Sequence, residues 1–319
     1  MFIIIKMYYF FYIIKMFIKQ PNTCFIVPTT PPFILPLVIS FAKLLTLGKL
    51  KWVYHVQDIH PEISFVGKNK TWVYKFLKAL DTFFLKNSNH VITLSDEMKS
   101  ALSARDNTIK NSISVVNNFT ENFIKSDMES LDCINEDRSK EKIIYIFSGN
   151  VGKFQRVTEL VTYFLDLKYF NDVLYILGDG EEIPKITTLL ATHVNKDRVR
   201  LLGRKPYDEA NQIAAKCDYG IVSLNPNITK YAYPSKFSAY LSMGLKVLAF
   251  VDKDSQISEE VERYDLGGVI STSDELKDFI NNSIALTDSE RVRINNVSIE
   301  LFGKKLLISR NFQLLESIK

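Results

Sequence analysis

The sequence predicts an α/β protein built from two Rossmann-like domains, and two observations carry this prediction. The chain has 319 residues, which suits two domains of roughly 150 residues each. From about Lys142 onward, short apolar runs alternate with longer amphipathic segments. Near-continuous apolar strands that alternate with helices are typical of a parallel sheet covered on both faces.

The second half shows this alternation completely. We expect strands at 142–149, 173–180, 198–203, 218–224, 245–251 and 267–271, and helices near 156–167, 181–194, 207–216, 234–243, 255–264 and 274–286. The first half is less regular. We expect strands at 24–27, 51–57, 90–94 and 112–118, and helices at 1–18, 33–46, 70–87 and 95–104, the last starting at Ser95.

The domain boundaries follow from this pattern and from a polar, acidic stretch between the halves. We expect an N-terminal domain over 1–127, a linker over 128–141, a second domain over 142–303 and a C-terminal helix over 304–319. A doubly wound domain usually opens with a buried strand and a Gly-rich turn. This chain opens with a helix, so we expect the N-terminal domain to be incomplete at its start. A misassigned or damaged gene start, a partner chain, or a helix covering the sheet edge would each account for it.

Charge is unevenly distributed along the chain. Residues 1–125 carry a net charge of +8, and the remainder carries −4. Positive charge beside aromatic segments fits either a membrane surface or a solvated basic face. Lys6 and Lys15 interrupt the apolar residues 1–18, and the run from Met7 to Ile14 is too short to span a bilayer. We therefore expect peripheral attachment at the cytoplasmic face of the membrane rather than a span.

Three widely spaced cysteines and four histidines without metal-ligand spacing disfavour a disulfide framework or a zinc site. The lysines are scattered and no recognition motif is present, so we expect no nucleic-acid partner.

Candidate phosphate-binding residues follow three strands of the second half. After the first strand, Gly149 and Gly152 would let backbone N–H groups approach a phosphate, and Lys153 would add charge, although a simple strand-to-helix turn explains the same glycines. The second strand ends in Gly178 and Gly180, which do not complete a dinucleotide-binding fingerprint. The third ends at Gly203, followed by the cations Arg204 and Lys205.

Residues 227–250 contain the best-defined segment. Pro234 can occupy the first position of a helix, which places Ser235 and Lys236 in the first turn, where an anion would bind. An ordinary capped helix that packs on the sheet is the alternative.

The order GNVGKFQ, LGDG, LGRKPYDE, DYGIVSL and YPSKFSAYLSMGLKVLA resembles the C-terminal domain of family 4 glycosyltransferases, in particular those that make bacterial surface polysaccharides. In the first half, WVYHVQDIHPE (52–62) and SVVNNF (114–119) resemble segments of the acceptor domain of that family. The resemblance runs from about residue 20 to 300. It implies a GT-B fold, in which two Rossmann-like domains face each other across a cleft. It also implies a UDP- or GDP-sugar donor, retention of anomeric configuration and no metal or other cofactor.

The resemblance also implies a donor site on the second domain. It puts Gly152, Lys153 and Gln155 near the diphosphate, the 203–207 loop near the base, and Ser235 and Lys236 beside the phosphates. Together with the strand-end residues, the predicted donor site comprises Gly149, Asn150, Gly152, Lys153, Gln155, Gly178, Gly180, Gly203, Arg204, Pro234, Ser235 and Lys236. Lys236 is also a candidate catalytic residue, because its charge could stabilise the leaving diphosphate.

Asp58 matches a polar position at the end of an N-domain strand in the same family and is a candidate catalytic or substrate-orienting carboxylate, with His60 and Glu62 nearby. A turn after the strand would explain Asp58 equally well. The family usually carries a carboxylate three residues after the lysine of PSK, and this chain has Ala239 there.

Three hypotheses follow from this pattern. The first is a transferase that extends a lipid-linked glycan at the membrane. The second is a non-catalytic subunit that needs a partner chain, which Ala239 favours. The third is a sugar-nucleotide epimerase. That activity would need carboxylates and histidines in the cleft, and the sequence does not place them there.

Overall fold

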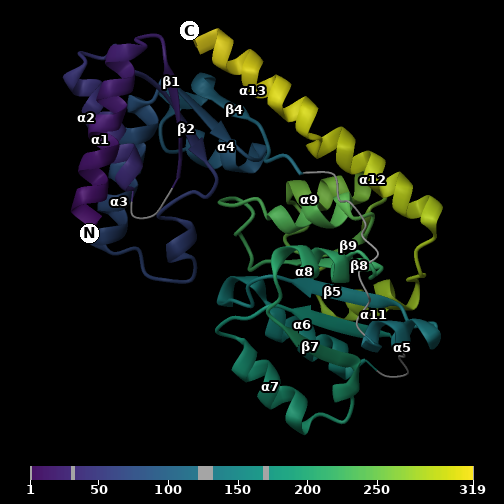
Figure 1. Cartoon of the computed structure of the whole chain (residues 1–319). Helices are drawn as coiled ribbons and strands as arrows, with labels where there is room; N and C mark the ends of the chain where they lie inside the picture. Colours follow the sequence, from purple (N-terminus) through teal and green to yellow (C-terminus); the bar gives the residue numbers. More distant parts are fainter. Residues whose placement is uncertain (1, 30–32, 121–131, 168–171, 319) are drawn as a thin grey trace. The chain divides into compact units, whose positions relative to one another are not determined.

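The computed structural model describes residues 2–29, 33–120, 132–167 and 172–318 (Figure 1). These residues form two compact units. Unit 1 comprises 1–118, 230–233 and 305–319, and unit 2 comprises 119–229 and 234–304. The predicted boundary at 127/128 lies outside the described residues.

Unit 2 contains a six-stranded sheet in which all strands are parallel and the order is β10-β9-β8-β5-β6-β7. The strands are β5 (Ile144–Ser148), β6 (Val173–Leu177), β7 (Val199–Gly203), β8 (Tyr219–Ser223), β9 (Lys246–Phe250) and β10 (Gly267–Ile270). Every residue of β6 and β8 is buried, which explains their continuous apolar sequences. All six predicted strands are confirmed.

The helices that the periodicity predicted for unit 2 are confirmed. They are α6 (Val157–Asp166), α7 (Ile183–Thr192), α8 (Tyr207–Ala214), α9 (Ser235–Ser242), α10 (Gln256–Arg263) and α11 (Ser273–Asn281). Two further helices, α5 (Asp132–Ser139) and α12 (Asp288–Phe302), were not predicted. Helix α5 differs from the expected linker over 128–141. Ile134 and Asp137 on α5 are buried, and Asp137 accepts a hydrogen bond from the Tyr175 hydroxyl (2.7 Å). A polar, acidic composition had suggested solvent exposure, but one face of the helix packs on the sheet.

The strand order has a topological switch point between β5 and β8. From β5 the chain builds the sheet outward through β6 to β7, and after β8 it builds in the other direction. The two central strands pair at Tyr145–Tyr219 and Ile146–Gly220, near their amino ends. A ligand crevice in a doubly wound sheet lies at the carboxyl ends of the strands beside such a point.

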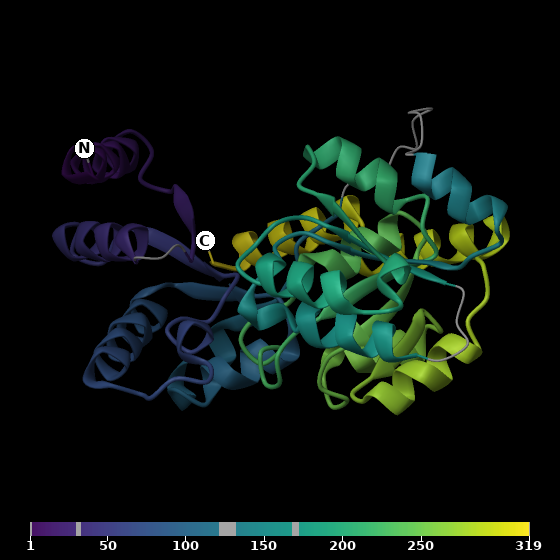
Figure 2. The ribbon, with the colours of Figure 1, turned by 90° about the horizontal axis from the view of Figure 1, so that it is seen from below.

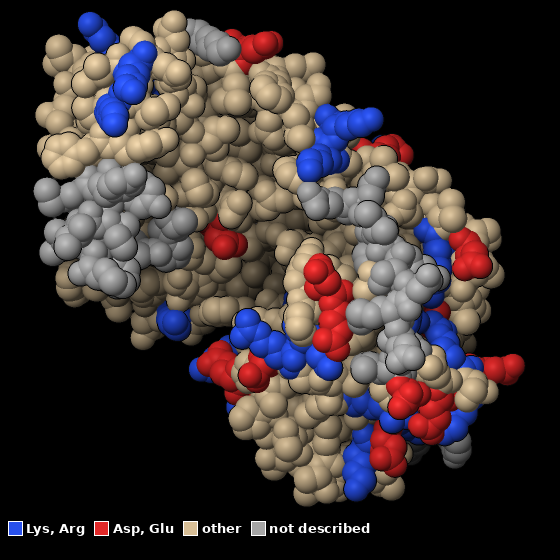
Figure 3. Space-filling model, in the orientation of Figure 1, with Lys and Arg blue, Asp and Glu red and all other residues tan. Residues whose placement is uncertain are grey.

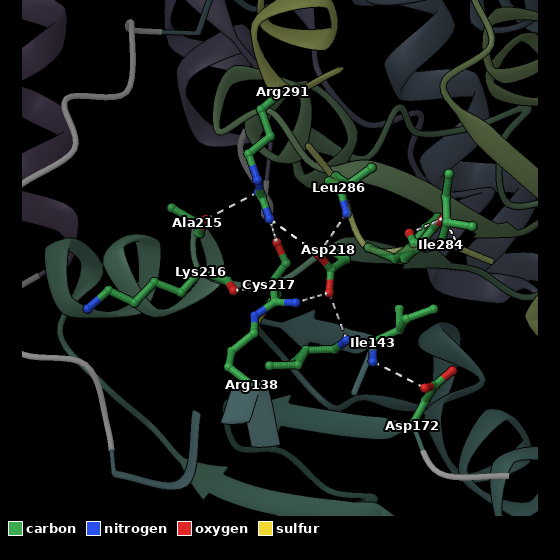
Figure 4. Close-up of polar contacts among 12 residues, drawn as sticks. Arg138, Ile143, Asp172, Ala215, Lys216, Cys217, Asp218, Ile284, Leu286 and Arg291 are labelled. Atoms are coloured by element: carbon green, nitrogen blue, oxygen red, sulfur yellow. Dashed lines mark hydrogen bonds and ion pairs between the residues drawn. The ribbon is translucent and has the colours of Figure 1, made fainter. Parts of the chain in front are cut away.

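A buried aspartate holds the amino ends of β5 and β8 together (Figure 4). The Asp218 carboxylate accepts a hydrogen bond from the Ile144 N–H (2.9 Å), and the Asp218 N–H donates to the Ile144 carbonyl (2.9 Å). Arg138 of α5 and Arg291 of α12 form ion pairs with the same carboxylate at 2.7 and 3.4 Å. The Leu286 N–H also donates to it, at 3.2 Å. Asp218 therefore joins two strands, two helices and a loop.

Unit 1 contains a four-stranded parallel sheet in the order β1-β2-β3-β4. The strands are β1 (Cys24–Pro28), β2 (Lys51–Val56), β3 (His90–Thr93) and β4 (Ile113–Val115), and the helices are α1 (Phe2–Lys19), α2 (Ile34–Leu45), α3 (Trp72–Asn87), α4 (Asp96–Ser103) and α13 (Lys304–Ile318). The predicted strands and helices are confirmed, as is the N-cap of α4, where the Ser95 hydroxyl accepts the Met98 N–H (3.1 Å). Whether an opening strand is missing stays a prediction.

Two layers of helix cover this sheet. Figures 1 and 2 show α1, α2 and α3 side by side along one side of it. On the other face, Leu307 of α13 packs in a cluster with Val53 and Ile92. None of the helices in the described residues has the length and apolarity needed to cross a membrane.

We expect Asp218→Ala to destabilise unit 2 by about 3 kcal/mol, because the substitution leaves two arginines and two backbone N–H groups without their acceptor. Urea unfolding followed by circular dichroism measures the change. The exposed Asp278→Ala on α11 serves as the control and should stay within about 0.5 kcal/mol of wild type. Equal unfolding midpoints for the two variants would contradict the role given to Asp218.

Candidate functional site

The loops that follow β5, β6 and β7 form one continuous rim at the carboxyl edge of the unit 2 sheet. The Gly149 N–H donates to the Leu177 carbonyl (2.8 Å), and the Gly178 N–H donates to the Gly203 carbonyl (2.9 Å). The Val151 N–H donates to the Asp179 carbonyl (2.9 Å). The predicted glycines at 149, 178 and 203 are therefore brought together by backbone hydrogen bonds.

At two of the predicted glycines, Gly178 and Gly180, a neighbouring loop comes so close that no side chain would fit. Gly178 has φ +152°, and a Cβ there would lie 1.9 Å from the Gly149 carbonyl oxygen. A Cβ on Gly180 would lie 2.4 Å from the Val151 carbonyl oxygen. Loop packing is thus sufficient to explain Gly178 and Gly180, without direct contact to a phosphate. Gly203 has φ +68° and open space around it.

Lys236 lies at the switch point, in the first turn of α9. Its amine is 3.6 Å from the centre of the Phe147 ring and 3.3 Å from the Gln155 side-chain oxygen. A Cβ on Gly149, which has φ +126°, would lie 2.9 Å from Cε of Lys236. The structure therefore brings together Lys236, Gln155 and Gly149, which the sequence had placed in one site.

The start of α9 differs by one position from the prediction. Pro234 is the N-cap, with an extended ψ of 117°, and Ser235 is the first helical residue. The missing N–H of proline is equally harmless there, because the first N–H groups of a helix have no intrahelical acceptor. Ser235 is exposed, and Lys236 is the second residue of the helix.

Burial lowers the pKa of Lys236 to about 7. Among the described residues, no carboxylate forms an ion pair with this amine. Burying a cation without an anionic partner is costly, and a bound anion would offset that cost. The geometry therefore suits an anionic group such as a phosphate.

Residues at the end of β8 and just after it hold the turn that carries Gln155, and the sequence did not single them out. The Ser223 hydroxyl donates to the Gln155 carbonyl. The Asn225 N–H donates to the Phe154 carbonyl (2.8 Å), and its side-chain amide donates to the Lys153 carbonyl (3.0 Å). These contacts fix the turn Lys153–Gln155 against the end of β8. The sequence signal that could have identified them is their position at or next to the end of the predicted strand DYGIVSL.

Tyr240 of α9 bridges the diverging strands. Its hydroxyl accepts the Ser148 N–H (2.9 Å) at the end of β5. Its ring lies against Gly220 of β8, where a Cβ would be 2.2 Å from the ring. Gly220 thus makes room for α9 at the switch point, and α9 carries Lys236.

The other predicted donor-site residues lie further along the rim. The Lys153 side chain is 67% exposed and forms an ion pair with Glu181 at 3.1 Å. Asn150 is exposed beside Gly152, where a Cβ would lie 2.7 Å from the Asn150 side-chain nitrogen. Arg204 is exposed and follows β7, which β6 separates from β5. Of the three cations expected to converge, Lys236 alone packs at the switch point within the described residues.

The candidate carboxylate Asp58 belongs to unit 1. It forms an antiparallel bridge with Ala232, and its N–H donates to the Thr29 hydroxyl (3.4 Å). Burial raises the pKa of Asp58, and nearby His60 opposes that rise. The Glu62 carboxylate binds the buried Arg105 guanidinium, so its contacts are those of a structural ion pair.

The described residues contain no group of three or more His, Cys, Asp or Glu side chains arranged to hold a metal ion.

We expect Gly178→Ala to cost more than about 3 kcal/mol of stability, because the new methyl group collides with the backbone of Gly149. Gly203→Ala is the matched control, since it also places alanine at positive φ but in open space. It should cost about 1 kcal/mol. Urea unfolding of both variants tests the rim, and equal costs would contradict its packing.

The depressed pKa of Lys236 predicts a pH-dependent stability. Between about pH 7 and about 10.4, the unfolded chain keeps the lysine proton and the folded chain does not, so stability should rise with pH across that window. In Lys236→Met this contribution should disappear. Unfolding curves for both proteins at several pH values measure it, and a constant difference in unfolding free energy would contradict a buried, neutral amine.

Comparison with known proteins gives matches to both the sequence and the fold. No family model matches the chain. The chain is 26% identical to the probable glycosyltransferase WbjE of Pseudomonas aeruginosa over 240 residues, which cover 72% of this chain and 58% of that protein. It is 25% identical to the phosphatidylinositol N-acetylglucosaminyltransferase GPI3 subunit of Saccharomyces cerevisiae (strain YJM789) over 162 residues, 50% of this chain and 35% of that protein. The matches thus span less than two thirds of either relative.

Solved structures show the same fold at lower identity. The crystal structure of Anabaena Alr3699/HepE in complex with UDP matches with a TM-score of 0.74 and 16% identity, over 95% of this chain and 82% of that one. The lipopolysaccharide outer core galactosyltransferase WaaB matches with a TM-score of 0.70 and 13% identity, over 99% of this chain and 81% of that one. The two Rossmann-like units of this chain therefore constitute a GT-B fold.

Proposed function

We propose that this GT-B chain is a glycosyltransferase that moves a sugar from a UDP- or GDP-linked donor to a lipid-linked glycan in cell-surface polysaccharide synthesis. One observation carries the proposal. The Lys236 amine is partly buried beside Phe147, Gly149 and Gln155 at the switch point of unit 2, with no carboxylate bound to it in the described residues. A donor diphosphate would supply the missing anion.

The chemistry of sugar transfer accounts for a cation at this position. Breaking the bond between sugar and diphosphate leaves negative charge on the departing phosphate, and a preorganised cation in a water-poor site stabilises that charge. We propose that Lys236 fills this role without a metal or other cofactor and that transfer retains anomeric configuration. The relative HepE was solved with UDP, which supports a uridine-linked donor.

We assign the acceptor to unit 1 and propose Asp58 as a residue that orients it. Its burial and raised pKa suit a carboxylate that exchanges a proton or hydrogen bond with a hydroxyl group. The net positive charge of residues 1–125 supports the proposal that the protein acts at the cytoplasmic face of a membrane, where a lipid-linked acceptor would be presented.

The donor site is tested by calorimetric titration with UDP and GDP. We expect one nucleotide to bind, and Lys236→Met to weaken binding roughly ten- to hundredfold, as the loss of a charge-assisted hydrogen bond predicts. Lys140→Met is the control, because Lys140 follows α5, is exposed and pairs with Glu136 rather than lying at the candidate site. We expect its affinity to match wild type.

Activity is then measured as transfer to lipid-linked glycans and as slow donor hydrolysis. Lys236→Met should lose both, and Asp58→Asn should lose transfer while keeping nucleotide affinity. If neither nucleotide binds to wild type, or if Lys236→Met binds as tightly as wild type, the proposed donor site is wrong.

A second candidate function is a subunit that requires a partner chain. It is favoured by Ala239 on α9, where the family resemblance implies a carboxylate, and one relative is itself named as a subunit. Co-purification from native cells tests it. A stable heteromer that becomes inactive when separated supports this candidate, whereas transfer by the isolated chain excludes it.

A further inference from the structure

The outward face of α3 carries large apolar side chains. Trp72, Phe76 and Phe83 are 77%, 59% and 44% exposed. Their spacing of four and then seven residues places them on one stripe of the helix, the one that faces away from the sheet. A solvent-facing stripe normally carries polar residues, so this one indicates an interaction surface.

Helix α2 continues the same surface. Leu37, Phe41, Leu44 and Leu45 follow helical spacing and are exposed. Helices α2 and α3 pack against each other, and the Lys43 amine of α2 donates to the Asn87 carbonyl at the end of α3 (2.6 Å). Figure 2 shows the two helices in one layer of unit 1. The two stripes therefore belong to neighbouring helices of one layer.

The charge around this surface is mainly positive. Residues 1–57 contain six lysines and no aspartate or glutamate. The acidic residue of α3, Asp81, is buried, where it accepts the Tyr54 hydroxyl (2.7 Å) and pairs with Arg105. Figure 3 shows that charged side chains of either sign are sparse on the visible face of unit 1.

A shallow hollow of about 750 Å³ runs along α3 and places lysines beside aromatic rings. Its lining includes Tyr74, Lys75, Lys78, Phe83 and Lys86. Lys78 contacts Glu62 at 3.3 Å and Lys86 contacts Asp106 at 2.8 Å, yet both lysines keep large exposed fractions. Lys75 is exposed next to Phe76.

We infer that the outward faces of α2 and α3 form a docking surface for a bilayer that contains anionic phospholipid. Aromatic and leucine side chains would enter the headgroup region, and the lysines would contact lipid phosphates. A second copy of this chain fits less well, because it would set lysines against lysines. The inference deepens the proposed function, on which the choice of a membrane partner rests, by naming the surface that brings unit 1 to its acceptor.

Tryptophan fluorescence gives a direct test, because the chain has two tryptophans in contrasting places. Trp52 is fully buried, and Trp72 is exposed. Vesicles of phosphatidylcholine with roughly one third phosphatidylglycerol should shift the emission to shorter wavelength, and pure phosphatidylcholine vesicles should do so far less. Trp72→Phe should bind without this shift, since only Trp52 remains.

Co-sedimentation with the same vesicles measures affinity. Lys70 is exposed just before α3, with its amine 5.5 Å from the centre of the Tyr74 ring. Lys70→Gln/Lys75→Gln should bind roughly 25-fold more weakly, at about fivefold for each lysine, and added salt should weaken wild-type binding. Trp72→Ser/Phe76→Ser should bind at least about tenfold more weakly. The matched control Lys140→Gln/Lys185→Gln removes two exposed lysines from unit 2 and should bind as wild type does.

The inference is overturned if wild type does not prefer anionic vesicles, or if the α3 variants bind as the control does. Capture of the surface by a protein, with no vesicle binding, would also overturn it. Failure of the proposed function is measured separately. Docking variants should keep wild-type nucleotide affinity, and Lys236→Met should keep vesicle binding while losing nucleotide.

Discussion

The candidate site depends on how β5 and β8 are joined. Asp218 fixes the amino ends of the two strands through paired hydrogen bonds with Ile144 and ion pairs with Arg138 and Arg291. Direct pairing then extends over two residues of each strand and stops before their carboxyl ends. The strands are thus fastened at one edge of the sheet and free to diverge at the other, where doubly wound proteins bind ligands.

Helix α9 lies where β5 and β8 diverge and contacts both strands. Tyr240 satisfies the Ser148 N–H that β8 does not reach, and Gly220 leaves space for its ring. The same helix delivers Lys236 against Phe147 and Gly149. Burial of the amine lowers its pKa because the charged form loses hydration, and this cost is what a diphosphate would relieve. Structural packing and the proposed anion affinity therefore have one origin.

Unit 1 has a different chemical character. Its buried charges are paired internally, as in the cluster of Arg105 with Asp81 and Glu62. Its exposed helices combine aromatic side chains with lysines, and the outer surface of α2 and α3 carries no carboxylate of these helices. Membrane docking by this unit and donor binding by unit 2 would divide recognition of the two substrates between the two units of the GT-B fold.

The sequence by itself determined the strands of both units and all of their helices except α5 and α12, because apolar runs and helical periodicity follow directly from burial on a sheet. It also indicated the rim glycines and Lys236, since glycine and proline leave local signals. Only the tertiary structure decided which of the predicted cations lies at the switch point. Lys236 packs at the switch point, whereas Lys153 pairs with Glu181 and Arg204 lies beyond β7. It also showed Asp218, Ser223, Asn225 and Tyr240 as supports, and α5 in place of a linker. These contacts join residues up to 92 positions apart, and no local pattern encodes them.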